Sequence, residues 1–220
     1  MRVELLSFWR TYAEVTAWAN LKAVLLHRPG PELEHVTDPD EAQMVDELDV
    51  PRAQRQHDAI ADAFRAVGVE VHYVEPNGPT PPNTMFVADL MVMTPEGAVL
   101  GRPASTVRAG EERWIARRLS DLGIPILRSV RGRGTFEGAD AAWLEPKTAM
   151  VARGLRTNGE GASQVRSTLE EMGADVVCVE LPYGAMHLMG QLRFADRDLA
   201  IAWPGRVPFG AVEALRERGY

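Results

Sequence analysis

An internal repeat is the feature of this sequence that most limits its fold. Three times, a segment with helical spacing of apolar residues ends in glycine and passes directly into a strand-like apolar run, at Gly68, Gly123 and Gly173. A fourth helical segment ends at Gly219, before Tyr220. The positions eight, four and one before each glycine predict the buried helical stripes: Ile60, Phe64, Val67, Ile115, Leu119, Leu122, Val165, Leu169, Met172, Ala211, Leu215 and Arg218. This shared phase indicates a repeated structural unit.

Pairs of apolar runs precede the helical segments. They cover residues 85–103, 139–154 and 192–205, and residues 22–30 supply one such run for the first copy. Pro-Glu-Gly and Asp-Arg-Asp between apolar runs are typical of β-hairpins. The predicted unit is strand–strand–helix–strand, about fifty residues long, and several such units must associate to bury their apolar faces. Because no strand follows Gly219, we expect one α/β domain over residues 1–220, incomplete after about four units.

Composition excludes several classes of protein. A net charge of −7 and a pI near 5.3 argue against nucleic-acid binding. The single cysteine excludes an internal disulfide framework. Residues 1–20 carry charges throughout, which predicts an amphipathic helix or an irregular lead-in and not a signal peptide. No run approaches the roughly 20 apolar residues of a membrane span, so we expect a cytoplasmic protein without membrane contact.

Unusual polar residues recur at one place in successive copies, just before the first strand of the pair. They are Asn83 and Asp89, then Glu137, then His187. If the copies surround a common centre, two carboxylates and an imidazole converge in one cleft, as acid–base chemistry or cation binding requires. The structural alternative is that these residues cap turns or are solvated.

The residues that form these motifs resemble arginine deiminases. The resemblance lies in residues 24–76, in PPNTMFVADL at 81–90, FEGAD at 136–140 and GLRTN at 154–158, and in the segment around His187, in the same order. Arginine deiminases belong to the guanidino-group-modifying superfamily, together with dimethylarginine dimethylaminohydrolases and amidinotransferases. The resemblance implies a pseudo-symmetric five-unit α/β propeller, the pentein fold, which agrees with the repeat.

The same resemblance implies a reaction and roles for residues. A cysteine thiolate attacks the carbon of an arginine-like guanidine, and an amine leaves through a covalent intermediate. Asp89 and Glu137 would bind the guanidinium, and His187 would act as general acid and then as base. Phe86 would lie along the face of the cation, although core packing is the alternative for this residue.

The carboxylate end of the substrate has its own predicted partners. By resemblance, Asn83, Arg102 and Arg156 would bind it, with structural ion pairs as the alternative for the two arginines.

Three differences from the family pattern bear on this prediction. The nucleophilic cysteine of the family lies near the C terminus, and Cys178 does not match it, because a buried inert thiol is expected within ADVVCVEL. We therefore expect the 220 residues alone to be inactive, with the nucleophile beyond them. Met189 stands where arginine deiminases carry an aspartate two residues after the histidine. The loss of this carboxylate weakens the expected binding of an unsubstituted guanidinium. The third difference is that the extra helical insertion of long bacterial arginine deiminases is absent, which brings the chain closer to the compact hydrolases of the superfamily. A smaller difference is that Ala139 replaces a common glycine.

Two alternative functions stay open. An amidinotransferase would use the same residues but pass the amidino group to an amine, and a cysteine-less protein would only bind guanidinium. No cofactor or metal is predicted, because the histidines lack metal-ligand spacing and the His57-Asp58 pair lies within an amphipathic helical segment. The predicted partner is a small guanidine, and a homodimer is left open.

Overall fold

The computed structural model describes residues 16–34, 36 and 38–220, which form two compact subdomains. The N-terminal subdomain contains residues 21–87 and 105–123, and the C-terminal subdomain contains residues 88–104, 124–220 and the described residues up to 20. Residues 1–15, which include most of the predicted amphipathic lead-in, lie outside the described residues. In the described part of the chain, no helix has both the length and the apolar character of a membrane span.

The N-terminal subdomain is built around the first copy of the repeat. Strands β1 (Ala23–Leu26) and β2 (Glu70–Tyr73) run parallel, and helix α2 (Val50–Ala66) lies between them in sequence. Asp49 caps α2, because its Oδ1 accepts a hydrogen bond from the Arg52 amide at 2.9 Å. Short 3-10 helices η1 (Pro31–Leu33) and η3 (Thr106–Arg108) and helix α3 (Glu112–Asp121) complete this subdomain.

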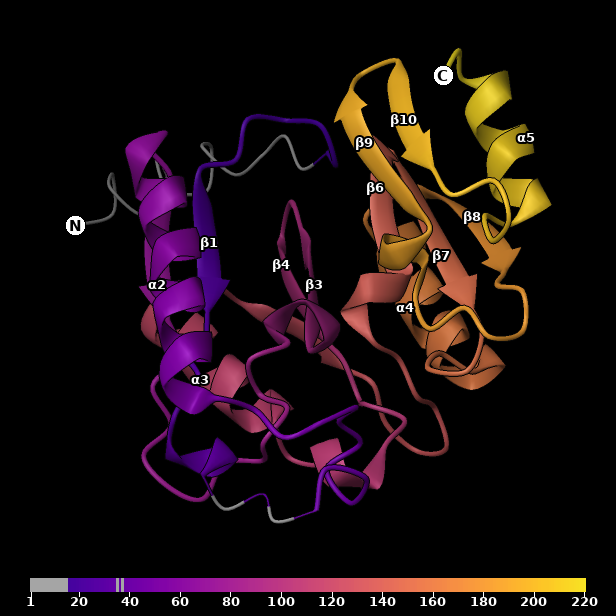
Figure 1. Cartoon of the computed structure of the whole chain (residues 1–220). Coiled ribbons are helices and arrows are strands. Elements are labelled where there is room, and N and C mark those ends of the chain that lie inside the picture. Colours follow the sequence, from indigo (N-terminus) through magenta and orange to yellow (C-terminus); the bar gives the residue numbers. More distant parts are fainter. Residues whose placement is uncertain (1–15, 35, 37) are drawn as a thin grey trace. The chain divides into compact units, whose positions relative to one another are not determined.

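The C-terminal subdomain contains the predicted hairpins (Figure 1). Antiparallel pairs form between β3 (Met91–Thr94) and β4 (Gly97–Leu100), between β6 (Ala141–Glu145) and β7 (Thr148–Arg153), and between β9 (Leu192–Asp196) and β10 (Leu199–Ala202). The strand after the helix then pairs in parallel with the second hairpin strand: β5 (Ile126–Ser129) with β4, and β8 (Asp175–Glu180) with β7. This is the strand–strand–helix–strand unit predicted from the sequence.

Glycine ends each repeated helix as predicted. Helices α2, α3, α4 (Gly159–Glu171) and α5 (Phe209–Glu217) are followed by Gly68, Gly123, Gly173 and Gly219, whose φ angles are 80°, 74°, 79° and 83°. A positive φ is costly for residues with a Cβ atom, so glycine is favoured at these helix ends. The repeat phase therefore has a conformational cause.

The core of the C-terminal subdomain consists of helices packed on sheets. Val165 and Leu169 of α4 are buried in a cluster with Val92, Val99 and Val151 of strands β3, β4 and β7. Ala211 and Leu215 of α5 belong to a second cluster with residues of β7 and β9. Each fully buried aliphatic side chain of this size contributes about 1.5–3 kcal/mol to folding. The predicted stripes of α4 and α5 are therefore confirmed at the positions eight and four residues before the glycine.

The predicted stripe is wrong for α2. Ile60 is 51% exposed and Val67 is 76% exposed, whereas Ile115 and Leu119 at matching positions of α3 are buried. Within the described part of the chain, the sheet beside α2 consists of the two strands β1 and β2. It therefore covers less of its helix than the three-stranded β6–β7–β8 sheet covers of α4.

The prediction of a buried Cys178 is also wrong, because the residue is exposed. Neighbouring residues of a strand point to opposite faces, and Val177 and Val179 face the cluster around α5. Cys178 therefore faces the other side of β8, the side on which Val176 packs against the cluster around α4. Because β8 is an edge strand of its sheet, this position is open to solvent.

Candidate functional site

Three short 3-10 turns, one before each hairpin of the C-terminal subdomain, carry the candidate site. Asp89 ends η2 (Val87–Asp89), Glu137 immediately precedes η4 (Gly138–Asp140), and His187 immediately precedes η5 (Leu188–Gly190). Each turn leads into the first strand of its hairpin, β3, β6 or β9. The equivalent placement predicted from the repeat is thus realised in the structure.

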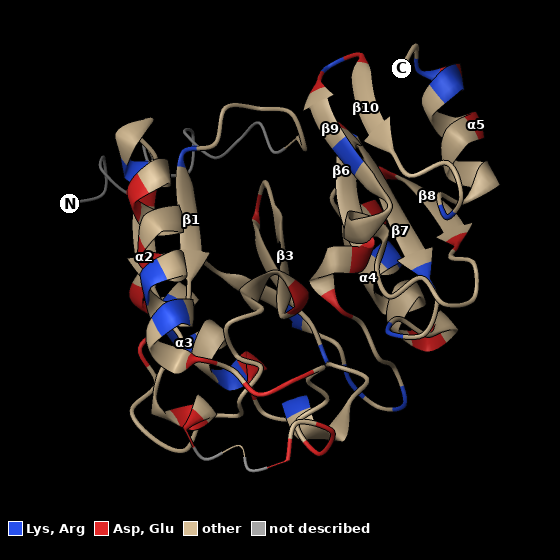
Figure 2. Cartoon of the chain, viewed as in Figure 1, with Lys and Arg blue, Asp and Glu red and all other residues tan. Residues whose placement is uncertain are grey.

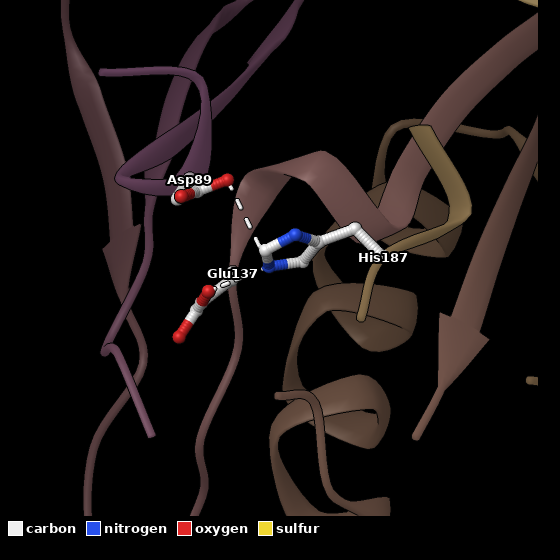
Figure 3. A group of neighbouring side chains, drawn as sticks. All are labelled: Asp89, Glu137 and His187. Carbon is white, nitrogen blue, oxygen red and sulfur yellow. Dashed lines mark hydrogen bonds and ion pairs between the residues drawn. The ribbon is translucent and has the colours of Figure 1, made fainter. Parts of the chain in front are cut away.

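The three side chains point toward one another (Figure 3). Nε2 of His187 lies 2.6 Å from Oε2 of Glu137 and 3.8 Å from Oδ1 of Asp89. Glu137 is fully buried, and Asp89 is 9% exposed. The structure therefore brings two carboxylates and an imidazole into one largely buried cluster, which we call the Asp–Glu–His cluster.

Backbone packing fixes Glu137 within the cluster. A Cβ atom on the next residue, Gly138, would lie 1.9 Å from the carbonyl oxygen of Met91, so only glycine allows η4 to approach β3 this closely. The side chain of Glu137 accepts a hydrogen bond from the Ala104 amide at 3.1 Å, and its own amide donates to Oγ1 of Thr157 at 3.2 Å. Ala139, the departure from the family glycine, fits within η4 as a buried residue.

Asp140 connects the turns that carry Glu137 and His187. It is fully buried, and its Oδ1 accepts a hydrogen bond from the amide of Leu188, the residue after His187, at 3.0 Å. Its Oδ2 accepts from the hydroxyl of Thr157 at 2.6 Å. Thr157 also accepts a hydrogen bond from the Glu137 amide. The contacts of Asp140 therefore extend to both Glu137 and His187. Sequence reasoning assigned no role to Asp140 or Thr157, although both lie in the quoted FEGAD and GLRTN motifs.

The pKa values of His187 and of the neighbouring Asp140 are both shifted. Burial lowers the pKa of His187, but the hydrogen bond with Glu137 and the negative charges of Asp89 and Asp140 outweigh it, so the pKa is raised. Burial raises the pKa of Asp140 to about 6, against the opposing hydrogen bonds from Thr157 and Leu188. The imidazole therefore retains its proton more readily than an ordinary histidine.

The raised pKa of His187 predicts a pH dependence of stability. A group whose pKa is higher in the folded state stabilises the fold below its unfolded pKa, here about 6.5, and loses that contribution as the pH rises through the folded value. We expect the free energy of unfolding to fall more steeply as the pH rises above about 6.5 in the natural protein than in a His187→Gln variant. Urea unfolding at a series of pH values measures this, and parallel curves would contradict it.

The two predicted carboxylate-binding arginines differ in their contacts. Nη1 of Arg156 lies 3.8 Å from Oε1 of Glu137, and its Nη2 lies 3.9 Å from the sulfur of Met186, next to His187. Arg156 is thus beside the cluster. The exposed side chain of Arg102 donates to the carbonyl of Gly132, while its backbone pairs with Phe136. The binding of a substrate carboxylate by either arginine stays a prediction.

Asn83 and Phe86 belong to the N-terminal subdomain and are described within it. The side chain of Asn83 is buried and donates to the Ala42 carbonyl at 2.8 Å. Phe86 is 50% exposed, and the guanidinium carbon of Arg108 lies 5.9 Å from its ring centroid. The ring of Phe86 therefore already faces one guanidinium, the kind of contact that was predicted for it with a substrate. Its role and that of Asn83 stay predictions.

The Asp–Glu–His cluster also has the spacing of a metal site. One ligand atom from each residue lies within 4.8 Å of the others. Two carboxylates and an imidazole are donors that divalent metals accept, but they equally suit a planar organic cation. The sequence-based expectation of no metal therefore stays a prediction.

Comparison with known proteins identifies the family. No protein-family model matches the chain. A dimethylarginine dimethylaminohydrolase of Streptomyces coelicolor is 33% identical over 198 residues, which cover 90% of this chain and 73% of that relative. The chain belongs to the dimethylarginine dimethylaminohydrolase family. The Pseudomonas aeruginosa member is 26% identical over 178 residues, 78% of this chain and 69% of the relative.

Solved structures of this family and its neighbours share the fold. A Cys-to-Ser mutant of the Pseudomonas aeruginosa enzyme, complexed with citrulline, has a TM-score of 0.72 and 24% identity, covering 84% of this chain and 70% of that one. The N-terminal domain of ArgZ, a cyanobacterial arginine dihydrolase, has a TM-score of 0.75 and 18% identity, covering 90% and 72%. Both are pentein propellers, which confirms the predicted fold class and the predicted superfamily.

The specific resemblance to arginine deiminases is local. The arginine deiminase of Streptococcus uberis is 43% identical over 67 residues, which cover 29% of this chain and 15% of that relative. The dimethylarginine dimethylaminohydrolase of Streptomyces coelicolor aligns with 90% of this chain. The motifs therefore identified the superfamily correctly, while the wider similarity assigns the chain to the dimethylarginine dimethylaminohydrolase family.

Proposed function

We propose that this protein is a hydrolase of a guanidino carbon–nitrogen bond in an arginine-like substrate. The observation that carries the proposal is the Asp–Glu–His cluster, in which a histidine with a raised pKa lies 2.6 Å from a fully buried carboxylate. The dimethylarginine dimethylaminohydrolase and arginine deiminase relatives support the same reaction class.

The two carboxylates suit the binding of a guanidinium. This cation is planar, carries its charge over several N–H donors and pairs well with carboxylates through charge-assisted hydrogen bonds. Asp89 and Glu137 approach the same imidazole from different turns, so a cation bound between them would lie beside His187. Burial strengthens these interactions, because water competes less for the charges.

His187 is assigned two proton transfers. As an imidazolium it donates a proton to the departing nitrogen, which leaves as a neutral amine when the carbon–nitrogen bond breaks. As the resulting neutral imidazole it accepts a proton from the water that attacks the same carbon. Glu137 orients the ring through its hydrogen bond and stabilises the charged form.

The attacking group is assigned to a cysteine thiolate, by resemblance to the superfamily. Its sulfur bonds to the guanidinium carbon as the amine departs, and the later attack of water breaks the carbon–sulfur bond, releasing a ureido product and the thiolate. Cys178 does not fit this role, because it lies within β8 and not in or next to the three turns that carry the Asp–Glu–His cluster. The second candidate is a guanidinium-binding protein without catalysis, which is favoured by the position of Cys178 outside the cluster.

Met189 bears on the choice of substrate. A half-buried methionine two residues after His187 offers no carboxylate where arginine deiminases carry an aspartate. An unsubstituted guanidinium would then have N–H donors with fewer partners, whereas an N-methylated guanidinium has fewer donors to satisfy. We therefore assign the substrate to the N-methylated arginines ahead of arginine.

Binding tests the proposal without depending on the nucleophile. Asp89→Asn should weaken binding of asymmetric dimethylarginine roughly tenfold or more, since a hydrogen bond to a charged group contributes about 1.5–3 kcal/mol. Isothermal titration calorimetry measures this affinity. Asp175→Asn, at an exposed residue of β8, is the matched control that should leave the affinity unchanged. Equal affinity of the Asp89 variant and the natural protein would overturn the proposed site. Turnover of the bound ligand by the full natural protein separates the hydrolase from the non-catalytic binder.

A further inference from the structure

A cavity of about 940 Å³ lies within the N-terminal subdomain, and its lining includes no residue of the Asp–Glu–His cluster. Its lining comes from the segment that follows β1, from one side of α2, and from the end of β2 and the segment that follows it up to Thr80. Its volume falls within the range of small-molecule sites, roughly 300–1,000 Å³. Nothing in the proposed reaction uses this cavity.

A buried ion pair forms part of the cavity lining. Nε2 of His27 lies 3.1 Å from Oε1 of Glu32, and its Nδ1 lies 3.0 Å from the carbonyl of Val74. Both partners are acceptors, so both ring nitrogens are satisfied together only when His27 is protonated. The side chains of His27 and Glu32 are each 6% exposed. This pair is therefore a fixed, charged element in the cavity lining.

Glu32 retains capacity for a further donor. The His27 contact and the 2.8 Å hydrogen bond from the Gly30 amide both fall on Oε1. An ionised carboxylate has about four acceptor sites over its two oxygens. Oε2 can therefore accept from a ligand in the cavity without breaking the pair with His27.

The basic residues of the lining are already paired with acidic neighbours. Arg28 donates to the two oxygens of Asp58 at 2.7 and 2.9 Å, and Arg65 donates to Asp62 at 2.9 Å. Glu75 is exposed, and no hydrogen bond or ion pair joins it to another described residue. Figure 2 shows the corresponding mixture of basic and acidic segments along α2. With Glu32 paired to His27, the uncompensated charge in the lining is that of Glu75, which is negative.

We propose that this cavity is a second binding site, for a small organic cation that carries a primary ammonium or guanidinium group. Oε2 of Glu32 would accept a hydrogen bond from the cation, and Glu75 would supply the second carboxylate. Both oxygens of Asp58 accept from Arg28, and the largely exposed Asp62 pairs with Arg65, so the site is assigned to Glu32 and Glu75. This site is independent of the proposed hydrolase function.

An NMR titration tests the second site. The probe is n-butylammonium, with n-butylguanidinium as a parallel arm and neutral n-butanol as the uncharged control, added to an Asp89→Asn/Glu137→Gln protein that lacks the primary carboxylates. We expect saturable shifts of the Gly30, Glu32 and Glu75 amide signals with at least one cation and none with butanol. The two cation arms show which headgroup the site prefers.

Variants of the lining decide the outcome. Glu75→Gln, on an exposed residue, and Glu32→Gln should each raise the dissociation constant roughly tenfold or more, whereas Glu34→Gln, an exposed glutamate nearby, should not. If Glu32→Gln disturbs the fold by removing the His27 partner, Glu75→Gln alone still decides. Absence of saturable shifts, or shifts that persist unchanged in Glu75→Gln, would overturn the second site. Neither result affects the Asp89-dependent binding that tests the proposed function.

Discussion

His187→Ala is expected to lower kcat of guanidine hydrolysis by the full natural protein about 10²–10⁴-fold, the usual contribution of a positioned general acid–base group. The reason is the geometry around the ring, where Glu137 at 2.6 Å and Asp89 at 3.8 Å hold an imidazolium beside the predicted guanidinium position. Without it, the departing nitrogen lacks a proton donor and the attacking water lacks a base. Steady-state release of the amine product measures the loss.

Two further variants separate proton transfer from structural damage. His187→Gln retains an N–H donor toward Glu137 and should keep most of the stability but not the activity. His72→Ala removes a histidine of β2 whose contact is with exposed Glu70, and it should retain full activity. Cys178→Ser should also be neutral, because Cys178 is an exposed residue of β8 and lies outside the turns that carry the Asp–Glu–His cluster. An active His187→Gln enzyme, or one inactivated by Cys178→Ser, would contradict the assigned roles.

The convergence of these three side chains could be predicted from the sequence because they occupy equivalent places in a repeat. Asp89, Glu137 and His187 each lie in the turn before a hairpin, and repeated units that share a centre bring such turns together. The helix ends were equally predictable, since a glycine with positive φ is a local requirement that the sequence displays directly.

Features that depend on distant partners were not predictable. The apolar stripe of α2 shows which face is apolar but not how much sheet covers it, and Ile60 is consequently exposed. Cys178 lies within an apolar run, but its exposure depends on β8 being an edge strand. Asp140 binds an amide 48 positions away, a contact that no local pattern encodes.

Asp140→Ala is expected to reduce both stability and catalysis, because Asp140 holds the turn of His187 in place. The substitution leaves the Leu188 amide and the Thr157 hydroxyl without their buried acceptor. Each unsatisfied buried group costs about 1–3 kcal/mol, so we expect a loss of about 2–5 kcal/mol in the free energy of unfolding. Urea unfolding measures the loss. Asp175→Ala, at an exposed residue of β8, is the control that should change stability little.

Asp140→Asn distinguishes a positioning role from a general loss of folding. The amide has one oxygen, which can still accept from Leu188, but its NH₂ group meets the Thr157 hydroxyl that now donates to Asp140. The hydroxyl must then reorient, which disturbs its contact with the Glu137 amide. We therefore expect a folded protein with a clearly lower kcat and a nearly unchanged KM.

The pH dependence of stability provides a second test with the Asp140→Asn variant. Because burial raises the pKa of the folded carboxyl to about 6, the protonated form is favoured by folding, and its stabilising contribution is lost as the pH rises from about 4 through 6. The free energy of unfolding of the natural protein should therefore fall relative to that of Asp140→Asn over this range. Asp140→Asn with natural kcat would show that this carboxylate does not position His187. A stability difference independent of pH would show that its pKa is not raised by folding.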